Sequence, residues 1–167
     1  MTDKNPYATP EAEVSVPDGG VDELASLGAR FGGAIIDGVI AMATIWPAMY
    51  FFGLFERAME GQQSMGDLVG GAVLGFALFL VINGYLLANR GQTVGKMLVK
   101  TRIVSVDDRK ILPIGKLILL RYLPVSVVAY VPLIGPILNL VNILFIFRED
   151  RRCVHDHIAG TVVIKAV

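Results

Sequence analysis

The sequence has only one cysteine, Cys153, and only two histidines, and charged residues make up 18% of its 167 residues. A single cysteine excludes an intrachain disulfide framework and a metal site built from four thiolates. The formal net charge is zero, with 15 basic and 15 acidic residues, which gives no support to nucleic-acid binding because that needs a basic surface. The histidines lie together and the apolar segments contain no nucleophile beside a base, so we expect neither enzymatic activity nor a cofactor.

Apolar residues are abundant: 54% of the chain is hydrophobic, and the mean hydropathy is +0.60. These values lie outside the usual range of a soluble domain of this length and predict an integral membrane protein. The first thirty residues lack the basic-then-apolar pattern of a cleavable signal peptide. We therefore expect the first apolar segment to remain in the protein as a membrane span.

The N-terminal segment, residues 1–22, differs from the rest of the chain because it is polar, acidic and contains three prolines. Such a segment cannot bury enough apolar surface to order itself, so we expect a flexible tail. Residues 23–167 are then a single membrane domain.

The membrane domain contains four apolar segments, at about residues 31–55, 68–87, 114–130 and 133–147. The last two come from one long apolar run, which the sequence V-P-L-I-G-P at residues 131–136 is expected to break because prolines interrupt helices. A helix needs about 20 apolar residues to cross a hydrocarbon core of about 30 Å. We predict an all-α membrane protein, a four-span helical bundle.

The distribution of charge orients this bundle. The loop at residues 88–112 is the most basic, whereas the loop at residues 56–67 is acidic. By the positive-inside rule the basic loop faces the cytoplasm. Four crossings place both termini on that same side, whereas three crossings would export the arginines at residues 148–152. We therefore predict a multi-pass protein with both termini in the cytoplasm.

A small β element is expected beneath the bundle. Residues 98–106 alternate apolar and polar side chains, and the D-D-R-K sequence that follows is a credible turn, so we predict a β-hairpin. The β-branched run at residues 161–164 follows Gly160 and is too short to span the membrane. A strand there that paired with residues 101–106 would satisfy its backbone and bring Asp156 towards the membrane surface.

Two ionisable residues, Arg30 and Asp37, interrupt the first apolar segment. Seven residues separate them, which places them on one helix face about 10 Å apart along the axis. A charge at mid-bilayer costs roughly 2.5 to 3.5 kcal/mol, so Asp37 should face protein or water. We expect Arg121, inside the third segment, to be its partner, and Arg30 either to meet Asp156 at the inner surface or to be a snorkelling anchor. The polar residues inside the other segments that complete this predicted network are Asn83, Asn139 and Asn142.

Two short motifs resemble ligand-binding sites, but each lacks a residue that such a site needs. G-Q-T-V-G-K-M at residues 91–97 is one residue shorter than a phosphate-binding loop and has Met97 where a magnesium-binding hydroxyl belongs. We expect it instead to end the second span and to hold Lys96 at the phospholipid surface. C-V-H-D-H at residues 153–157 would present Cys153 and both histidines on one side of a strand, but it lacks a fourth ligand, so no metal site is expected.

Four motifs together resemble the RDD family of bacterial membrane proteins, and they occur in the family's order. They are A-R-F-G-G-A-I-I-D at 29–37, G-Q-T-V-G-K-M at 91–97, L-R-Y-L at 120–123 and H-D-H-I-A-G-T-V-V at 155–163. The family is named for one arginine and two aspartates, which the resemblance places at Arg30, Asp37 and Asp156. It implies a protein of the bacterial inner membrane with a role in transport, and some members resemble sodium/proton antiporters in activity.

The leading functional hypothesis is a small-ion or proton-coupled transporter, with a sodium ion or a proton as its substrate. The buried network of Arg30, Asp37, Arg121 and Asp156 would support it. Four short helices offer little room for a complete pathway, so this hypothesis also implies a homo-oligomer, which the glycine spacings of the spans would allow.

The alternative hypothesis is a non-transporting membrane accessory or scaffold. Its basic cytoplasmic face would bind a partner protein or anionic membrane lipid through Lys96, Lys100 and Arg102. A basic residue next to a span attracts anionic headgroups by about 1 kcal/mol.

Overall fold

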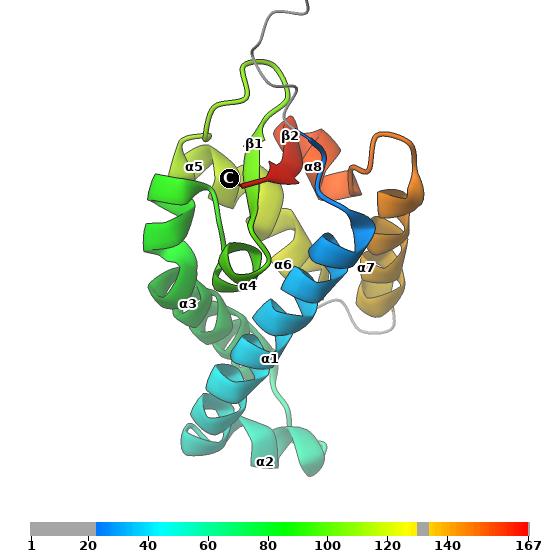
Figure 1. Cartoon of the computed structure of the whole chain (residues 1–167). Coiled ribbons are helices and arrows are strands. Elements are labelled where there is room, and N and C mark those ends of the chain that lie inside the picture. Colours follow the sequence, from blue (N-terminus) through cyan, green and yellow to red (C-terminus); the bar gives the residue numbers. More distant parts are fainter. Residues whose placement is uncertain (1–22, 130–133, 167) are drawn as a thin grey trace, which may run out of the picture.

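Two long helices form the frame of the molecule. The computed structural model describes residues 23–129 and 134–166, and the predicted flexible tail at 1–22 lies outside them. The helices α1 (Leu27–Phe51) and α3 (Met65–Arg90) extend away from a group of shorter elements, and α2 (Leu54–Met59) connects their far ends (Figure 1). With 25 and 26 residues, α1 and α3 are the two described helices that are long and apolar enough to cross a membrane.

Local sequence signals set the ends of these helices. The Ser26 side chain accepts a hydrogen bond from the Ala29 backbone N–H at 3.1 Å and caps α1. Ser64 and Asp67 form a reciprocal capping box at the start of α3. Each helix is followed by a glycine in the left-handed region, Gly53 with φ of 65° and Gly91 with φ of 62°. The first span was predicted to continue to residue 55, but the chain turns at Gly53, so α1 ends at Phe51.

The apolar run after residue 113 forms two shorter helical segments. They consist of α5 (Ile114–Leu117), the π-helical turn η1 (Ile118–Tyr122) and α6 (Leu123–Ala129), then α7 (Ile134–Leu144) and the 3₁₀ turn η2 (Phe145–Phe147). Both segments are helical where spans were predicted, but neither is as long as α1 or α3. The structure therefore supports a mostly helical membrane protein with two candidate spans, and four crossings stay a prediction.

The shorter elements at one end of α1 and α3 form what we call the cap, residues 91–113 and 148–166 (Figure 1). The cap contains α4 (Val94–Leu98), β1 (Thr101–Ser105), α8 (Val154–Ala159) and β2 (Thr161–Lys165). The strands β1 and β2 pair antiparallel from Thr101↔Lys165 to Ser105↔Thr161. This pairing confirms the predicted contact between residues 101–106 and the C-terminal strand.

Two local predictions in the cap are wrong. The D-D-R-K turn forms, with the Ser105 N–H donating to the Lys110 carbonyl at 2.8 Å, but no return strand follows. The chain instead continues to Pro113 and α5, and the buried β-branched run of β2 takes the place of the predicted hairpin partner. Residues 153–157, whose alternating side chains were considered as part of a strand, begin the helix α8 instead, because Asp156 at its third position completes a capping box with Cys153.

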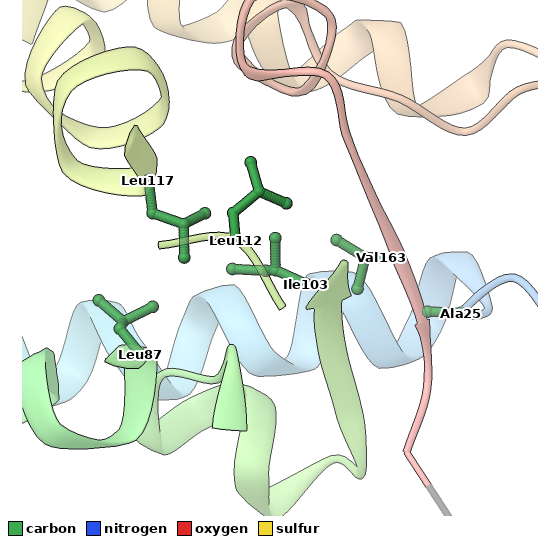
Figure 2. Packing of buried hydrophobic residues seen from close by; sticks show 6 residues of the cluster. All are labelled: Ala25, Leu87, Ile103, Leu112, Leu117 and Val163. Atoms are coloured by element: carbon green, nitrogen blue, oxygen red, sulfur yellow. The ribbon is translucent and has the colours of Figure 1, made fainter. Parts of the chain in front are cut away.

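The hydrophobic core lies where the cap meets the long helices. Its buried side chains come from parts of the chain that are far apart in the sequence, and they converge in Figure 2: Ala25, Leu87, Ile103, Leu112, Leu117 and Val163. Farther from the cap, large apolar side chains of α1 and α3 are exposed, including Trp46 at 63% and Val73 at 64%. The cap is thus packed like a small globular domain, while the long helices present the apolar surface that lipid would cover.

We predict that Gly95→Ala destabilises the protein. A Cβ at Gly95 would overlap the Gly33 carbonyl oxygen and would lie 2.7 Å from Asp37 Cγ, so α4 could no longer approach α1. We expect a loss of about 1 to 3 kcal/mol in the free energy of unfolding, measured by denaturant unfolding in detergent micelles. The matched control is Gly38→Ala, whose Cβ would meet nothing within 4 Å. Equal stability of the two variants would contradict the close approach of the helices.

Candidate functional site

Asp156 lies between two arginines. Its side chain is completely buried, and its Oδ2 is 2.7 Å from Arg30 Nη2. Its Oδ1 accepts a hydrogen bond from Arg121 Nη1. Because Asp156 belongs to α8, Arg30 to α1 and Arg121 to η1, this cluster joins the first long helix, the π-helical turn and the cap.

Two further donors complete the coordination of this carboxylate. The Thr161 hydroxyl donates to Oδ1 at 3.0 Å, and the Cys153 backbone N–H donates to Oδ2 at 3.1 Å. An ionised carboxylate offers roughly four acceptor sites, which these two donors and the two guanidinium groups use. Asp156 is therefore held in one position by a fully formed set of hydrogen bonds.

The same place contains a group of potential metal ligands. Ligand atoms of Cys153, His155 and Asp156 lie within 4.8 Å of one another. However, Arg30 Nη2 is 3.8 Å from Cys153 Sγ, and both arginines already bind the carboxylate. Two fixed positive charges would repel a metal cation at this point, so the cluster is an ion-pair centre rather than a metal site.

Asp37 lies on α1 about two helical turns after Arg30, and its carboxylate binds the N-terminal end of α4. Its Oδ1 accepts a hydrogen bond from the Gly95 N–H at 2.7 Å, and its Oδ2 accepts one from the Thr93 hydroxyl at 2.5 Å. Asn83 of α3 accepts a hydrogen bond from the Val94 N–H at 3.0 Å. The first N–H groups of a helix lack partners within the helix, and its positive end favours an anion. Side chains from both long helices therefore fix α4.

The predicted pairing of Asp37 with Arg121 is wrong, because Arg121 binds Asp156 and Lys96 is the cation beside Asp37. Lys96 Nζ is 3.9 Å from Asp37 Oδ2 and makes no hydrogen bond with the described residues. Burial, followed by the charge of Arg121, lowers the pKa of Lys96 to about 8, although Asp37 acts in the opposite direction. Lys96 was expected at the phospholipid surface, but its side chain is only 21% exposed.

Two cavities meet at Lys96. One, of about 370 Å³, lies against α1, α3 and α6 and includes Phe76 and Ser126 in its lining. The other, of about 570 Å³, lies against α1, the end of α7 and the cap, and includes Phe31 in its lining. We call them the α3-side cavity and the α7-side cavity. Lys96, Arg121 and His155 line both of them, so these polar side chains separate two otherwise mainly apolar spaces.

Asn142 and His155 form a polar contact at the edge of these cavities. Asn142 Oδ1 is 2.9 Å from His155 Nδ1 and also accepts a hydrogen bond from the His155 backbone N–H at 3.2 Å. Burial, and then the positive charges of Arg121, Lys96 and Arg30, hold the pKa of His155 well below its usual value, so the ring is neutral at pH 7. Asn139, one turn earlier on α7, takes part in neither centre within the described residues.

Sequence reasoning missed several residues that build these centres. Thr93 and Thr161 each bind one of the two aspartates, and Gly95 supplies a backbone N–H and the space that lets α4 approach. Of these residues, Thr93 could have been found from the sequence, since a threonine before a short helix, as in T-V-G-K, is a typical N-cap residue. The structure shows this cap, with Thr93 Oγ1 accepting from the Lys96 N–H at 3.4 Å.

Comparison with protein families decides the assignment, because the sequence model of the RDD family matches residues 24–160. The chain belongs to the RDD family. RDD proteins are membrane proteins, which agrees with the two long apolar helices. Comparisons with curated proteins and with solved structures gave no match.

We predict that Asp156→Asn strongly destabilises this RDD protein. The substitution removes the negative charge and leaves the buried guanidinium groups of Arg30 and Arg121 without a counter-ion. Breaking a buried ion pair on one side costs about 3 to 5 kcal/mol, which denaturant unfolding in micelles would measure. The control is Asp108→Asn, on an exposed ion pair with Lys110, where we expect a change below about 1 kcal/mol. Similar losses in both variants would contradict a special role for Asp156.

The lowered pKa of Lys96 predicts a pH dependence of stability. Its pKa is about 8 in the folded protein and 10.5 ordinarily, so the unfolded chain binds more protons between these values. The contribution of Lys96 to the free energy of unfolding therefore rises with pH in this window. Relative to Lys96→Gln, the wild type should become more stable from pH 8 to 10.5. The exposed Lys116→Gln should show no such trend, and a difference that falls with pH would contradict the lowered pKa.

Proposed function

We propose that this RDD protein exchanges a small monovalent cation, such as sodium, for a proton across the membrane, with Asp37 and Lys96 as the exchanging pair. The observation that carries the proposal is the position of Lys96. Its ammonium group borders both the α3-side and the α7-side cavity, and its nearest described anion is the Asp37 carboxylate at 3.9 Å. A cation that reached Asp37 from either cavity would compete directly with this ammonium group.

The charges around the pair favour such competition. Lys96, Arg30 and Arg121 carry three positive charges near the two negative charges of Asp37 and Asp156. An added cation is disfavoured while Lys96 is protonated, because the cluster already has an excess positive charge. When Lys96 releases its proton, a cation that binds the Asp37 carboxylate restores the same net charge. Because the pKa of Lys96 is about 8, this release requires only a modest change in free energy near neutral pH.

The cluster of Asp156 with Arg30 and Arg121 also supports the proposal, because these side chains are held in fixed positions. Arg30 and Arg121 are fully engaged with Asp156, so they are not free to bind Asp37 in place of a cation. Asp37 also keeps one bond to the Gly95 N–H and one to Thr93, which hold its carboxylate beside Lys96. In this proposal the two arginines and Asp156 hold the site in position, while Asp37 and Lys96 exchange ions.

The proposed function includes a topology. We infer four crossings in the bacterial inner membrane, with the cap and both termini in the cytoplasm, from the excess of Lys and Arg in the cap. Each of α1 and α3 exposes apolar side chains along its length. A second copy of the chain covering part of this surface would complete a pathway that four short helices cannot enclose alone.

Transport in proteoliposomes tests the proposal. With an imposed sodium gradient at about pH 8, wild-type protein should drive proton movement, reported by a pH-sensitive dye inside the vesicles. Asp37→Asn keeps an oxygen that accepts from Gly95, and Lys96→Gln removes the titrating group. We expect both variants to reduce flux to that of empty vesicles, because each removes one partner of the exchange.

The matched control for this experiment is Lys116→Gln, the same substitution at an exposed position of α5. It should transport like the wild type. Absence of sodium-dependent or pH-dependent flux in the wild-type protein would show that cation exchange is wrong. Normal flux in Lys96→Gln would show that another group carries the proton.

A further inference from the structure

A third cavity lies on the cap, away from Asp37 and Asp156. It has a volume of about 420 Å³, and three cationic side chains line it: Arg90, Lys100 and Arg102. Arg90 is the last residue of α3, Lys100 lies between α4 and β1, and Arg102 belongs to β1. The lining contains no carboxylate among the described residues. Three positive charges therefore share one space without a counter-ion in the described chain.

These three cations differ from most others in and near the cap because they bind no carboxylate or carbonyl group within the described residues. Arg30 and Arg121 bind Asp156, Arg152 binds backbone carbonyls, and Lys165 binds Glu23. In contrast, the recorded side-chain contact of Arg90 is a weak one, 3.9 Å from Nη1 to Met97 Sδ.

The hydrogen bonding of Arg102 is a further indication that this cavity binds an anion. Its Nε is completely buried, and it has no hydrogen-bond partner in the described chain. Buried polar groups in folded proteins are nearly always hydrogen-bonded, which makes this unpaired Nε unusual. The Arg102 side chain lines the cavity and forms no side-chain hydrogen bond or ion pair within the described chain, so its terminal N–H groups are available to an acceptor there. The neighbouring Gln92 donates through its amide nitrogen to the Thr101 carbonyl at 2.8 Å, and no hydrogen bond joins its side chain to Arg102 within the described chain.

The geometry points to a binding site for a phosphate group in this cavity, held by Arg90, Lys100 and Arg102. Guanidinium groups bind phosphate oxygens in pairs, and lysine adds a point charge. Three cations suit a phosphate better than a single carboxylate, because a phosphate presents more acceptor oxygens and up to two negative charges. The cavity is larger than a bare phosphate, which leaves space for a small organic group attached to it.

The position of the cavity identifies two sources of that phosphate. Arg90 ends α3, which is long and apolar enough to cross a membrane, so the cavity opens near the level of the lipid headgroups. An anionic phospholipid could place its headgroup there, and a soluble phosphate ester could enter from the aqueous side. The phosphate site does not depend on cation exchange, since none of these three residues forms a hydrogen bond or ion pair with Asp37 or Lys96 in the described structure, and neither of those two lines this cavity.

The test compares two variants of the full chain that lose equal charge. Arg90→Gln, Lys100→Gln and Arg102→Gln together remove the three cations of the cavity, while Arg109→Gln, Lys110→Gln and Lys116→Gln remove three exposed cations elsewhere. Native mass spectrometry in micelles measures bound phosphatidylglycerol, with phosphatidylcholine as the zwitterionic comparison. Calorimetric titration with glycerol phosphate measures the soluble source.

We expect the cavity variant to lose affinity for the preferred probe by roughly fivefold for each charge removed. The control variant should bind like the wild type. Loss of phosphatidylglycerol binding alone identifies a lipid headgroup as the ligand, and loss of glycerol phosphate binding identifies a soluble ester. Either result supports a phosphate site.

Two results would overturn the inference: binding of neither probe by the wild type, or equal losses in the cavity and control variants. Arg102 Nε has no partner to lose, so the cavity variant should fold, which circular dichroism and gel filtration would check. If the triple substitution does not fold, the exposed single variant Lys100→Gln is compared with Lys116→Gln in the same assays. Equal binding in these two variants would also overturn it.

Discussion

The carboxylate of Asp156, held between Arg30 and Arg121, is the contact on which the rest of this RDD protein depends. It connects α8 of the cap to α1 and to the π-helical turn η1. Burying three charges carries a large desolvation cost, so the cluster contributes less net stability than its short contacts suggest. It strongly disfavours any arrangement that leaves one of these charges unpaired. The cluster therefore fixes the position of the cap on the membrane helices.

The two aspartates that make the family resemblance have different environments. Asp156 is completely buried and receives donors on all sides. Asp37 is held by Thr93 and Gly95, yet its neighbouring cation, Lys96, is 3.9 Å away and adjoins two cavities. A carboxylate with a saturated set of bonds suits a structural role, whereas a looser ion pair beside open space suits exchange. The proposed division of roles follows from this difference in contacts.

Much of the fold was predictable from hydropathy and local pattern. The apolar segments became helices because a single segment in lipid can satisfy its own backbone hydrogen bonds only as a helix, and the β-branched run at 161–164 became the strand β2. The hairpin and the strand at residues 153–157 were wrong for a common reason. Alternation predicts an extended segment but does not say which partner pairs with it, and over five residues it competes with a capping signal such as that of Asp156.

The sequence by itself determined that this is a membrane protein, which segments are apolar, and that Arg30, Asp37 and Arg121 interrupt them. Only the tertiary structure decided which cation meets which aspartate. Arg30 and Asp156 are 126 positions apart in the chain, and Asp37 and Gly95 are 58 apart. Arg30, Lys96 and Arg121 carry the same charge, so their chemistry alone does not distinguish among partners. The pairing follows from the close approach of α4 to α1, which Gly33 and Gly95 permit. This approach places Lys96 beside Asp37, so that Arg121 pairs with Asp156.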